Sequence, residues 1–216
     1  MSNAVSAIYE KLHTHYGNLH WWPAQTPYEI MVGAVLTQNT AWRNVEKVIA
    51  NFEGRLTPQF VQALDTDTLI DIIRPAGFFN QKAAYLKALT AWFARYGYDI
   101  PTVRCKPLAQ LRPELLAIKG IGKETADCIL LYALGLPTFV VDAYTVRLCT
   151  RYTLDAGTGY DAVKAFFEAA LPRDEALFNN YHAAIVYLCK DFCRKRNPLC
   201  ASCPLGASCE KAHLFG

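Results

Sequence analysis

Four cysteines near the C-terminus have the residue type and spacing of a metal centre. Cys193, Cys200, Cys203 and Cys209 follow the pattern C-x6-C-x2-C-x5-C within 17 residues. Soft thiolate ligands select zinc or iron–sulfur clusters. A four-cysteine zinc ribbon usually has two C-x2-C pairs far apart, whereas this stretch has one such pair and two wider arms. The spacing therefore favours a larger polynuclear centre.

Two disulfides, or four unrelated thiols, are the alternative interpretation of these cysteines. Residues 1–17 lack a basic segment followed by an apolar stretch, so no signal peptide is visible. The chain has no apolar run of 18 residues, so we expect no membrane span. We therefore expect a cytoplasmic, reducing environment, in which disulfides are rare. The other cysteines are then expected to be free thiols of the core: Cys105, Cys128, Cys149 and Cys189.

A second candidate site is the segment 118–123, with the sequence Ile-Lys-Gly-Ile-Gly-Lys. Gly120 and Gly122 permit a tight backbone and close approach by another molecule. The helix expected after them would point its first amides outward, toward an anion such as phosphate. A plain turn between helices is the alternative. The pattern is typical of a helix-hairpin-helix, which binds a DNA backbone without reading its sequence.

A third candidate is Asp142, in the sequence Val-Val-Asp-Ala-Tyr at 140–144. The apolar stretch delivers one carboxylate to the start of a predicted helix. An ordinary helix N-cap is the alternative, since aspartate is a favoured capping residue. The order of the hairpin, then Val-Val-Asp, then the four cysteines is much more specific than any one of these features.

The elements that must position these residues are predicted to be helices. Helical periodicity dominates the chain, and long alternating strand patterns are absent. With 216 residues, 52% of them hydrophobic, the chain can form one large or two small domains. We predict an all-α protein with two lobes, the second of which contains the cysteines. The predicted helices are 5–16, 27–36, 40–52, 65–73, 81–96, 107–118, 124–134, 143–152, 162–171 and 180–190.

The charge of the chain permits a nucleic-acid partner without demanding one. The formal net charge is +3 and the isoelectric point is about 8.4. Residues 190–216 contain five basic and two acidic residues, so this segment is basic for its length. Three of the basic residues, Arg194, Lys195 and Arg196, lie between the first two cysteines of the cluster.

Taken together, these motifs resemble those of the endonuclease III family of base-excision DNA glycosylases, over about residues 28–209. The resemblance implies a six-helix barrel with the hairpin in residues 20–136, and a second helical domain from residues 1–19 and 137–216. It implies that the four cysteines bind a 4Fe–4S cluster. Asp142 matches the family's catalytic aspartate, and Gln38 matches the glutamine that fills the hole left by a flipped base. A monomer that binds double-stranded DNA with a damaged base is expected.

One position departs from the bifunctional members of that family. Their Schiff-base lysine lies two residues after the second glycine of the hairpin, where this chain has Glu124. A carboxylate cannot form the imine that leads to strand cleavage. Lys123 is adjacent, but one residue along a helix turns about 100°, so it should point elsewhere. The chain is therefore predicted to release a base without cleaving the strand.

The base itself is suggested by a closer resemblance to the 3-methyladenine branch of the family. Three segments carry it: 119–124, 74–82, and Trp21-Trp22-Pro23 together with Trp42. In that branch, aromatic residues from the places that match Trp21-Trp22-Pro23 and Trp42 line the base pocket. An alkylated purine is cationic, so stacking against electron-rich indoles is favoured and the base leaves readily. Core packing is the alternative role for the tryptophans. Lys190 lies one helical turn before Cys193 and is a further candidate for the pocket, with a surface position as the alternative.

The predicted mechanism assigns a role to each candidate. Phosphates bind the hairpin and the basic loop, and Gln38 enters the stack as the purine is extruded. The Asp142 carboxylate stabilises an oxocarbenium-like sugar and orients water, with Glu124 assisting. The predicted base pocket contains Trp21, Trp22, Pro23, Trp42 and Lys190. The predicted DNA contacts are Gln38, Asn39, Gly120, Ile121, Gly122, Lys123, Thr125, Arg194, Lys195 and Arg196.

Three alternative functions share this scaffold. A glycosylase acting on uracil or thymine opposite guanine would bind a neutral pyrimidine, for which two stacking indoles are less needed. A bifunctional glycosylase, which also cleaves the strand as a lyase, would need a Schiff-base lysine at another position, because residue 124 is a glutamate. A DNA-binding protein without catalysis would have no need of Asp142.

Overall fold

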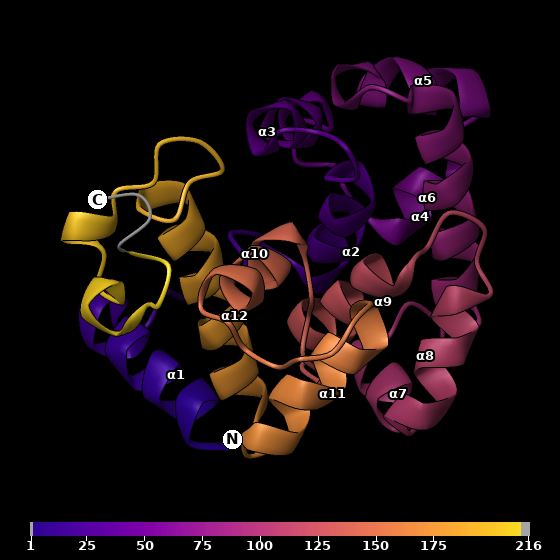
Figure 1. Ribbon diagram of the computed structural model, residues 1–216. Coiled ribbons are helices and arrows are strands. Elements are labelled where there is room, and N and C mark those ends of the chain that lie inside the picture. Colours follow the sequence, from indigo (N-terminus) through magenta and orange to yellow (C-terminus); the bar gives the residue numbers. More distant parts are fainter. Residues whose placement is uncertain (1, 213–216) are drawn as a thin grey trace. The chain divides into compact units, whose positions relative to one another are not determined.

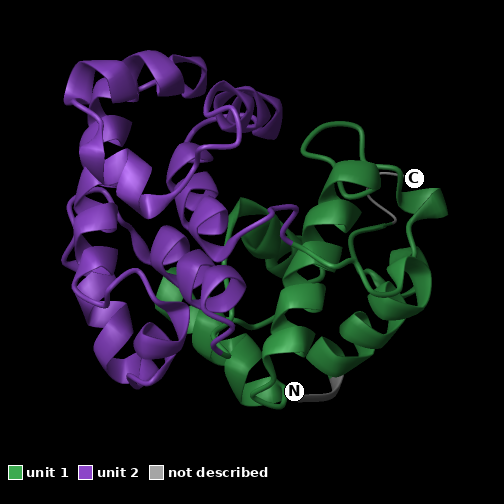
Figure 2. Ribbon diagram, turned by 180° about the vertical axis from the view of Figure 1, so that it is seen from behind, with its two compact units in different colours: residues 1–21, 137–216 green, residues 22–136 purple. Residues whose placement is uncertain are grey.

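The computed structural model describes residues 2–212, and every regular element in that part of the chain is helical (Figure 1). The predicted all-α class is confirmed for these residues. No helix among them is both long and apolar enough to cross a lipid bilayer. The chain forms two compact units, shown in Figure 2: unit 1 contains residues 1–21 and 137–216, and unit 2 contains residues 22–136.

Unit 2 is built from eight α-helices and two short non-α segments within the described residues. Its first helix, α2, is apolar along most of its length, with Met31, Val32 and Val35 fully buried. Thr26 caps this helix and Pro27 occupies its first turn, both typical of a helix start. The helices are α2 (Pro27–Leu36), α3 (Trp42–Asn51), α4 (Pro58–Ala63), α5 (Thr66–Ile73), α6 (Phe79–Ala94), α7 (Ile100–Arg104), α8 (Leu108–Leu116) and α9 (Lys123–Cys128), with the 3-10 turn η1 (Arg74–Ala76) and the π-helical turn η2 (Ile129–Ala133).

Unit 1 joins the N-terminal helix to the C-terminal third of the chain. Its core is aromatic: Phe139 stacks on Phe167 with ring centroids 4.4 Å apart, and both rings contact Tyr181. The hydroxyl of Tyr181 donates to the carbonyl of Val5, which ties the two ends of the chain together. The elements are α1 (Ser2–Tyr16), α10 (Ala143–Arg151), α11 (Tyr160–Ala170), α12 (Glu175–Asp191) and the 3-10 turns η3 (Cys200–Ser202) and η4 (Gly206–Ser208).

The observed helices differ from the predicted ones in four instructive places. Two short helices were not predicted, α4 and α7, although both begin with a side-chain cap followed by a proline at the first turn. Helix α12 begins at Glu175 rather than near residue 180, because Asp174 caps it. The predicted helix 124–134 is α9 continued by a π-helical turn.

Candidate functional site

The hairpin of unit 2 connects α8 to α9. Ile121 is buried, and its amide donates to the carbonyl of Ile118 at 3.0 Å. Gly120 has φ of +88°, and a Cβ added there would lie 2.4 Å from the ring of Tyr85. Gly122 has φ of −85° and open space where a Cβ would be. Only the first glycine is therefore demanded by the fold, and the second leaves exposed backbone at the start of α9.

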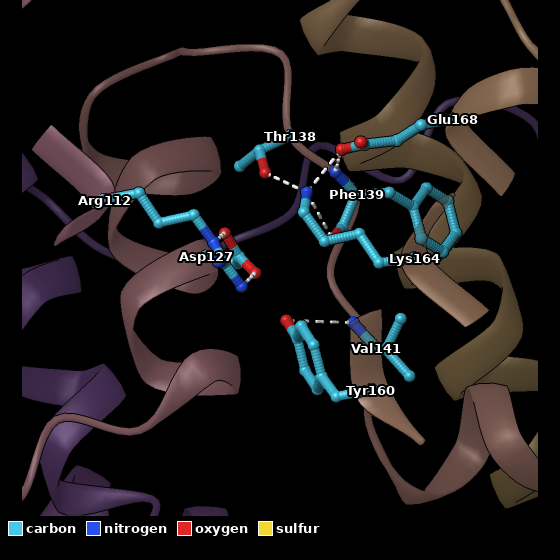
Figure 3. A network of polar contacts seen from close by, with 8 residues as sticks. All are labelled: Arg112, Asp127, Thr138, Phe139, Val141, Tyr160, Lys164 and Glu168. Carbon is cyan, nitrogen blue, oxygen red and sulfur yellow. Dashed lines mark hydrogen bonds and ion pairs between the residues drawn. The ribbon is translucent and has the colours of Figure 1, made fainter. Parts of the chain in front are cut away.

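An ion pair braces the two helices of the hairpin. The guanidinium of Arg112 on α8 donates to both carboxylate oxygens of Asp127 on α9, at 2.9 and 3.1 Å (Figure 3). Asp127 has no exposed surface. Two parallel charge-assisted bonds fix the relative orientation of two planar groups, so this pair sets how α8 and α9 meet. Sequence reasoning missed it, since neither residue belongs to the glycine pattern.

The loop 37–41 is bonded directly to this hairpin. The side-chain amide of Gln38 donates to the carbonyl of Gly120 at 2.9 Å and to the hydroxyl of Thr125 at 3.0 Å. Thr125 is buried, whereas Asn39 is exposed and has φ of +52°. Gln38, Gly120 and Thr125, which were predicted to contact DNA, are thus brought together. The side-chain nitrogen of Gln38 and the hydroxyl of Thr125 are therefore used within the protein.

A buried lysine, which was not predicted from the sequence, forms hydrogen bonds in and around the same loop. Lys82 on α6 is 2% exposed, and its ammonium donates to the carbonyls of Leu36 (2.7 Å) and Ala76 (3.0 Å) and to the hydroxyl of Thr40 (2.7 Å). Burial lowers the pKa of Lys82 to about 8. The available signal was its position on the apolar stripe of α6, four residues before the buried Leu86.

The aromatic residues predicted to line a base pocket fall into two groups. In unit 2, Trp22 contacts Trp42 edge to face, with centroids 5.4 Å apart and planes at 77°, and it also contacts Tyr132. The ring of Trp22 covers Gly33, and Pro23 is exposed. Because Trp22 and Trp42 touch each other, a base does not lie between these two rings in this arrangement.

The second group lies in unit 1. Trp21 contacts Tyr187 edge to face at 5.8 Å, and the ammonium of Lys190 lies 5.7 Å from the centroid of the Trp21 ring. The cation therefore occupies one face of this indole. The five predicted pocket residues are thus divided between the units, as are the two predicted catalytic residues, with exposed Glu124 in unit 2 and Asp142 in unit 1.

Asp142 is the N-cap of α10, as the capping interpretation predicted. One oxygen, Oδ1, accepts from the amides of Tyr144 (2.9 Å) and Thr145 (2.8 Å) and from the hydroxyl of Thr145 (3.0 Å). The other oxygen, Oδ2, lies 3.5 Å from Nε2 of His182 on α12. The cap and a possible chemical role therefore use different oxygens of one carboxylate.

The electrostatic surroundings keep this carboxylate ionised. Burial by itself raises the pKa of Asp142, but attraction to His182, 3.5 Å away, and the hydrogen bonds from Thr145 lower it further than burial raises it. The net pKa lies below the ordinary value. The sequence did not mark His182 as a partner of Asp142, because this contact becomes visible only when α10 and α12 are placed side by side.

The extended segment leading to Asp142 is fixed by one face of α11 (Figure 3). Glu168 accepts from the amide of Phe139 at 2.9 Å, and Lys164 bonds Thr138, Glu168 and the carbonyl of Phe139. Tyr160, four residues before Lys164, accepts from the amide of Val141 at 3.4 Å. Residues spaced by four lie on one face of a helix, so α11 aligns the segment that ends at Asp142.

The four predicted metal ligands line one cavity in unit 1. Cys193, Cys200, Cys203 and Cys209 line this cavity together with residues that include Arg151 and Lys211. Among the described residues, no three His, Cys, Asp or Glu side chains converge on a single ion. Four thiols that line one cavity are a donor set that fits an iron–sulfur cluster.

Arginines of α10 hold the start of this cysteine loop, which we define as residues 193–212. Arg151 donates to the sulfur of Cys193 at 3.3 Å and to the carbonyl of Arg194 at 2.7 Å. A hydrogen bond from Cys189 and the charge of Arg151 lower the pKa of Cys193 to about 6, which favours the ligating thiolate form. Arg194, Lys195 and Arg196 are exposed.

A glycine inside the loop was not singled out from the sequence. A Cβ added at Gly206 would lie 2.5 Å from the carbonyl oxygen of Cys200. The backbone of the loop therefore folds back on itself at a distance that no side chain permits. This close approach helps four cysteines on a short segment to face one space.

Comparisons with known proteins agree with these observations. Residues 32–173 match the HhH-GPD superfamily base excision DNA repair protein family. A protein of Methanocaldococcus jannaschii, whose name proposes it as a DNA repair glycosylase, is 47% identical over 210 residues, 95% of each chain.

Two solved structures extend the comparison. A trapped endonuclease III–DNA covalent intermediate superposes with a TM-score of 0.84 at 23% identity, covering 99% of this chain and 98% of the other. The H. pylori 3-methyladenine DNA glycosylase bound to 1,N6-ethenoadenine has a TM-score of 0.72 at 28% identity, covering 88% and 95%. With the family match over residues 32–173, these findings show that the chain belongs to the HhH-GPD superfamily of base excision DNA repair proteins and has the endonuclease III fold.

Proposed function

We propose that the protein is a monofunctional DNA glycosylase that hydrolyses the N-glycosidic bond of alkylated purines, such as 3-methyladenine, flipped out of duplex DNA. The family supports base excision, and 28% identity to a 3-methyladenine glycosylase supports the class of base. The observation that carries the reaction is the Asp142 carboxylate. It is ionised and ordered, and its Oδ2 is not used by the helix cap.

The first step in this proposal is the binding and bending of duplex DNA. The exposed backbone around Gly122 and the side chain of Lys123 bind phosphate on one strand. The exposed basic residues Arg194, Lys195 and Arg196 bind phosphate as well. These contacts carry no sequence information, as expected of an enzyme that must find a lesion anywhere.

Base extrusion is assigned to Gln38. To enter the stack, its amide must leave the carbonyl of Gly120 and the hydroxyl of Thr125. This coupling suggests that the hairpin and the loop 37–41 respond to DNA together. Exposed Asn39, with its left-handed backbone, lies at the tip of the same loop.

Bond cleavage is assigned to Asp142. As the purine leaves, positive charge develops on the sugar, and an ordered carboxylate stabilises that charge without reorganising. The same oxygen can orient the attacking water. An alkylated purine already carries positive charge and is a good leaving group, so a strong general acid is unnecessary. Exposed Glu124 is proposed to assist in positioning water or base.

The absence of strand cleavage is assigned to Glu124, which occupies the position of the Schiff-base lysine. A carboxylate forms no imine with the sugar. Borohydride should therefore trap no covalent protein–DNA adduct during base release. A robust adduct would assign the lyase reaction to another residue, with Lys123 or Lys190 the first to test, and would reject the monofunctional proposal.

One observation favours a second candidate, a glycosylase for uracil or thymine opposite guanine. The ammonium of Lys190 already lies over the Trp21 ring, so that indole offers less to a cationic base. A neutral pyrimidine would not be repelled by this lysine. Trp22 and Trp42 remain the residues proposed to contact an alkylated purine.

The four cysteines are proposed to hold a 4Fe–4S cluster. A tetrahedral zinc ion would draw four sulfurs to within roughly 4 Å of one another, given Zn–S bonds of about 2.3 Å. Four thiols that line one cavity without converging on a single ion fit a cluster of several irons better. When bound, the cluster supplies structure to the cysteine loop rather than a step of hydrolysis. Its ligation would present Arg194, Lys195 and Arg196 to phosphate.

The experiment that tests the function measures base release. The protein is incubated with duplexes containing methylated purines, uracil opposite guanine or thymine opposite guanine, and the freed base is identified by chromatography. Release of 3-methyladenine supports the first proposal, and release of only a pyrimidine supports the second. Asp142→Asn should slow release by at least roughly 100-fold while duplex binding remains. Equal turnover by this variant would leave Asp142 with a capping role alone.

A further inference from the structure

The two oxygens of Asp142 are held by two different elements of unit 1. All three capping hydrogen bonds, from Tyr144 and Thr145 of α10, end on Oδ1. Oδ2 instead faces α12, where Nε2 of His182 lies 3.5 Å away. Residues 142 and 182 are far apart in the chain, and their meeting depends on the packing of α10 along α12 (Figure 1).

Helix capping does not explain the presence of His182. The cap is complete on Oδ1, so an apolar side chain at position 182 would leave it intact. The His182 side chain is 6% exposed and its neighbours on α12, such as Ala183 and Ile185, are buried apolar residues. Placing an imidazole there has a desolvation cost that burial of a similar apolar ring would avoid. The imidazole nitrogen Nε2 faces Oδ2 of Asp142 at 3.5 Å, which gives the imidazole a role that an apolar ring could not fill.

We propose that His182 is a positioning residue for base release: the helix cap fixes Oδ1 of Asp142, and the imidazole fixes the direction of Oδ2, the oxygen that faces the reacting sugar and water. This inference rests on the proposed function, because it gives Oδ2 a substrate. A carboxylate held at both oxygens loses no orientation as positive charge develops, which is the condition for electrostatic catalysis.

His182 also affects the ionisation of Asp142. Its attraction is the largest of the influences that lower the pKa of Asp142 against the effect of burial. Two other groups of unit 1 that can carry charge contact Tyr144, two residues after Asp142. Cys189 on α12 donates to the carbonyl of Tyr144 at 3.6 Å, and the guanidinium of Arg147 on α10 lies 5.4 Å from the Tyr144 ring. Neither is changed in the variants below, so differences between variants report on His182.

The direction of the pH effect follows from the sign of the shift. Catalysis requires ionised Asp142, so activity is lost as the pH falls through the pKa of Asp142. Loss of His182 raises that pKa toward its ordinary value. The acidic limb of the pH profile should then move to higher pH.

Three variants test the proposal by single-turnover base release over a range of pH. His182→Phe keeps a ring but removes its nitrogens, and it should slow release by roughly 10- to 100-fold, the scale of a misplaced catalytic group. His182→Gln keeps an N–H donor and should recover much of the rate at neutral pH without restoring the acidic limb. Tyr181→Phe removes the neighbouring buried hydroxyl, which donates to Val5, and should leave the acidic limb in place.

A carbon-13 titration of the Asp142 carboxyl group provides a readout that does not depend on activity. A higher Asp142 pKa in His182→Phe, together with slower release and a displaced acidic limb, supports the proposal. An unchanged carboxyl titration and pH profile in His182→Phe, while Asp142→Asn is inactive, overturns the inference and leaves the proposed function standing. Wild-type release by Asp142→Asn overturns the proposed function, and with it any catalytic role of His182.

Discussion

The hairpin of unit 2 and the cysteine loop of unit 1 are both proposed to bind phosphate, yet they are held in shape by different means. The hairpin is anchored by buried Ile121, by the close packing of Gly120 on Tyr85 and by the Arg112–Asp127 ion pair. In the cysteine loop, residues 193–212, Leu205 is the single buried residue. Two three-residue 3-10 turns are its regular structure.

The two proposed binding surfaces therefore differ in what keeps them ordered. A segment with buried apolar anchors is ordered by the same packing that folds its domain. A segment with four inward-facing thiols and almost no core has to be ordered by what the thiols bind. The hairpin should therefore keep its shape without a cofactor, and the cysteine loop should not.

The largest expected effect is the loss of the cysteine loop on removal of one ligand. In Cys200→Ala, amide hydrogen exchange across 193–212 should accelerate by ~100-fold or more, because binding of the proposed cluster would be coupled to the folding of this segment. Exchange across the hairpin, residues 117–128, should hardly change. Cys105→Ala, at an exposed cysteine of unit 2, is the matched control.

Chemical analysis of the same preparations sharpens this test. The unmodified protein should contain about four iron atoms per chain and inorganic sulfide, whereas Cys200→Ala should contain much less of both. One zinc ion per chain without sulfide would reject the cluster. Equal exchange in the loop with and without metal would show that the loop orders itself.

The next effect concerns the two glycines of the hairpin. Gly120→Ala should destabilise the protein by about 2–4 kcal/mol, from a left-handed backbone and a clash with Tyr85. Gly122→Ala is the matched control, since its φ is ordinary and its Cβ meets open space. It should cost less than about 1 kcal/mol but weaken DNA binding where the backbone approaches phosphate. Urea denaturation and duplex affinity measure both, and equal destabilisation would contradict the packing argument.

A smaller effect is expected at Lys82, beneath the loop 37–41. Lys82→Met should cost about 1–3 kcal/mol, because the carbonyls of Leu36 and Ala76 lose their donor. The pKa of Lys82 is lowered to about 8 from 10.5, so between these pH values the unfolded chain binds the proton that the folded chain has released. The stability of the wild type relative to Lys82→Met should therefore rise with pH across that window. A flat or falling difference in thermal unfolding would show that the ammonium is not desolvated.

The smallest expected effect on stability is at Gln38. Gln38→Ala removes two hydrogen bonds to the hairpin and should cost about 1 kcal/mol. Asn39→Gly, which suits a positive φ, is the neighbouring control and should lie within about 0.5 kcal/mol of wild type. If Gln38→Ala loses far more base release than stability, the residue acts on DNA. If base release and stability fall in proportion, Gln38 only stabilises the hairpin.

Much of this architecture could be predicted from residue patterns. Apolar stripes at helical spacing predicted most of the long helices, and the cysteine spacing predicted a common cavity. The missed helices α4 and α7 are too short for a periodic stripe, although Thr57 and Asp99 are recognisable caps. Roles that depend on two helices meeting were not predictable, since no local pattern marks Lys82 or His182 as different from other residues of their types.

The helical class, the glycine turn, the helix cap at Asp142 and the set of four thiols follow from local sequence, because each depends on neighbours within a few residues. Tertiary structure alone decided that Gln38 bonds the hairpin, that Arg112 pairs with Asp127 and that His182 faces the second oxygen of Asp142. It also decided that Trp22 and Trp42 touch, and that Trp21 lies in the other unit. The physical reason is that hydrogen bonds and ring contacts act over a few ångströms in space, and separation along the chain does not reveal which surfaces will be brought that close.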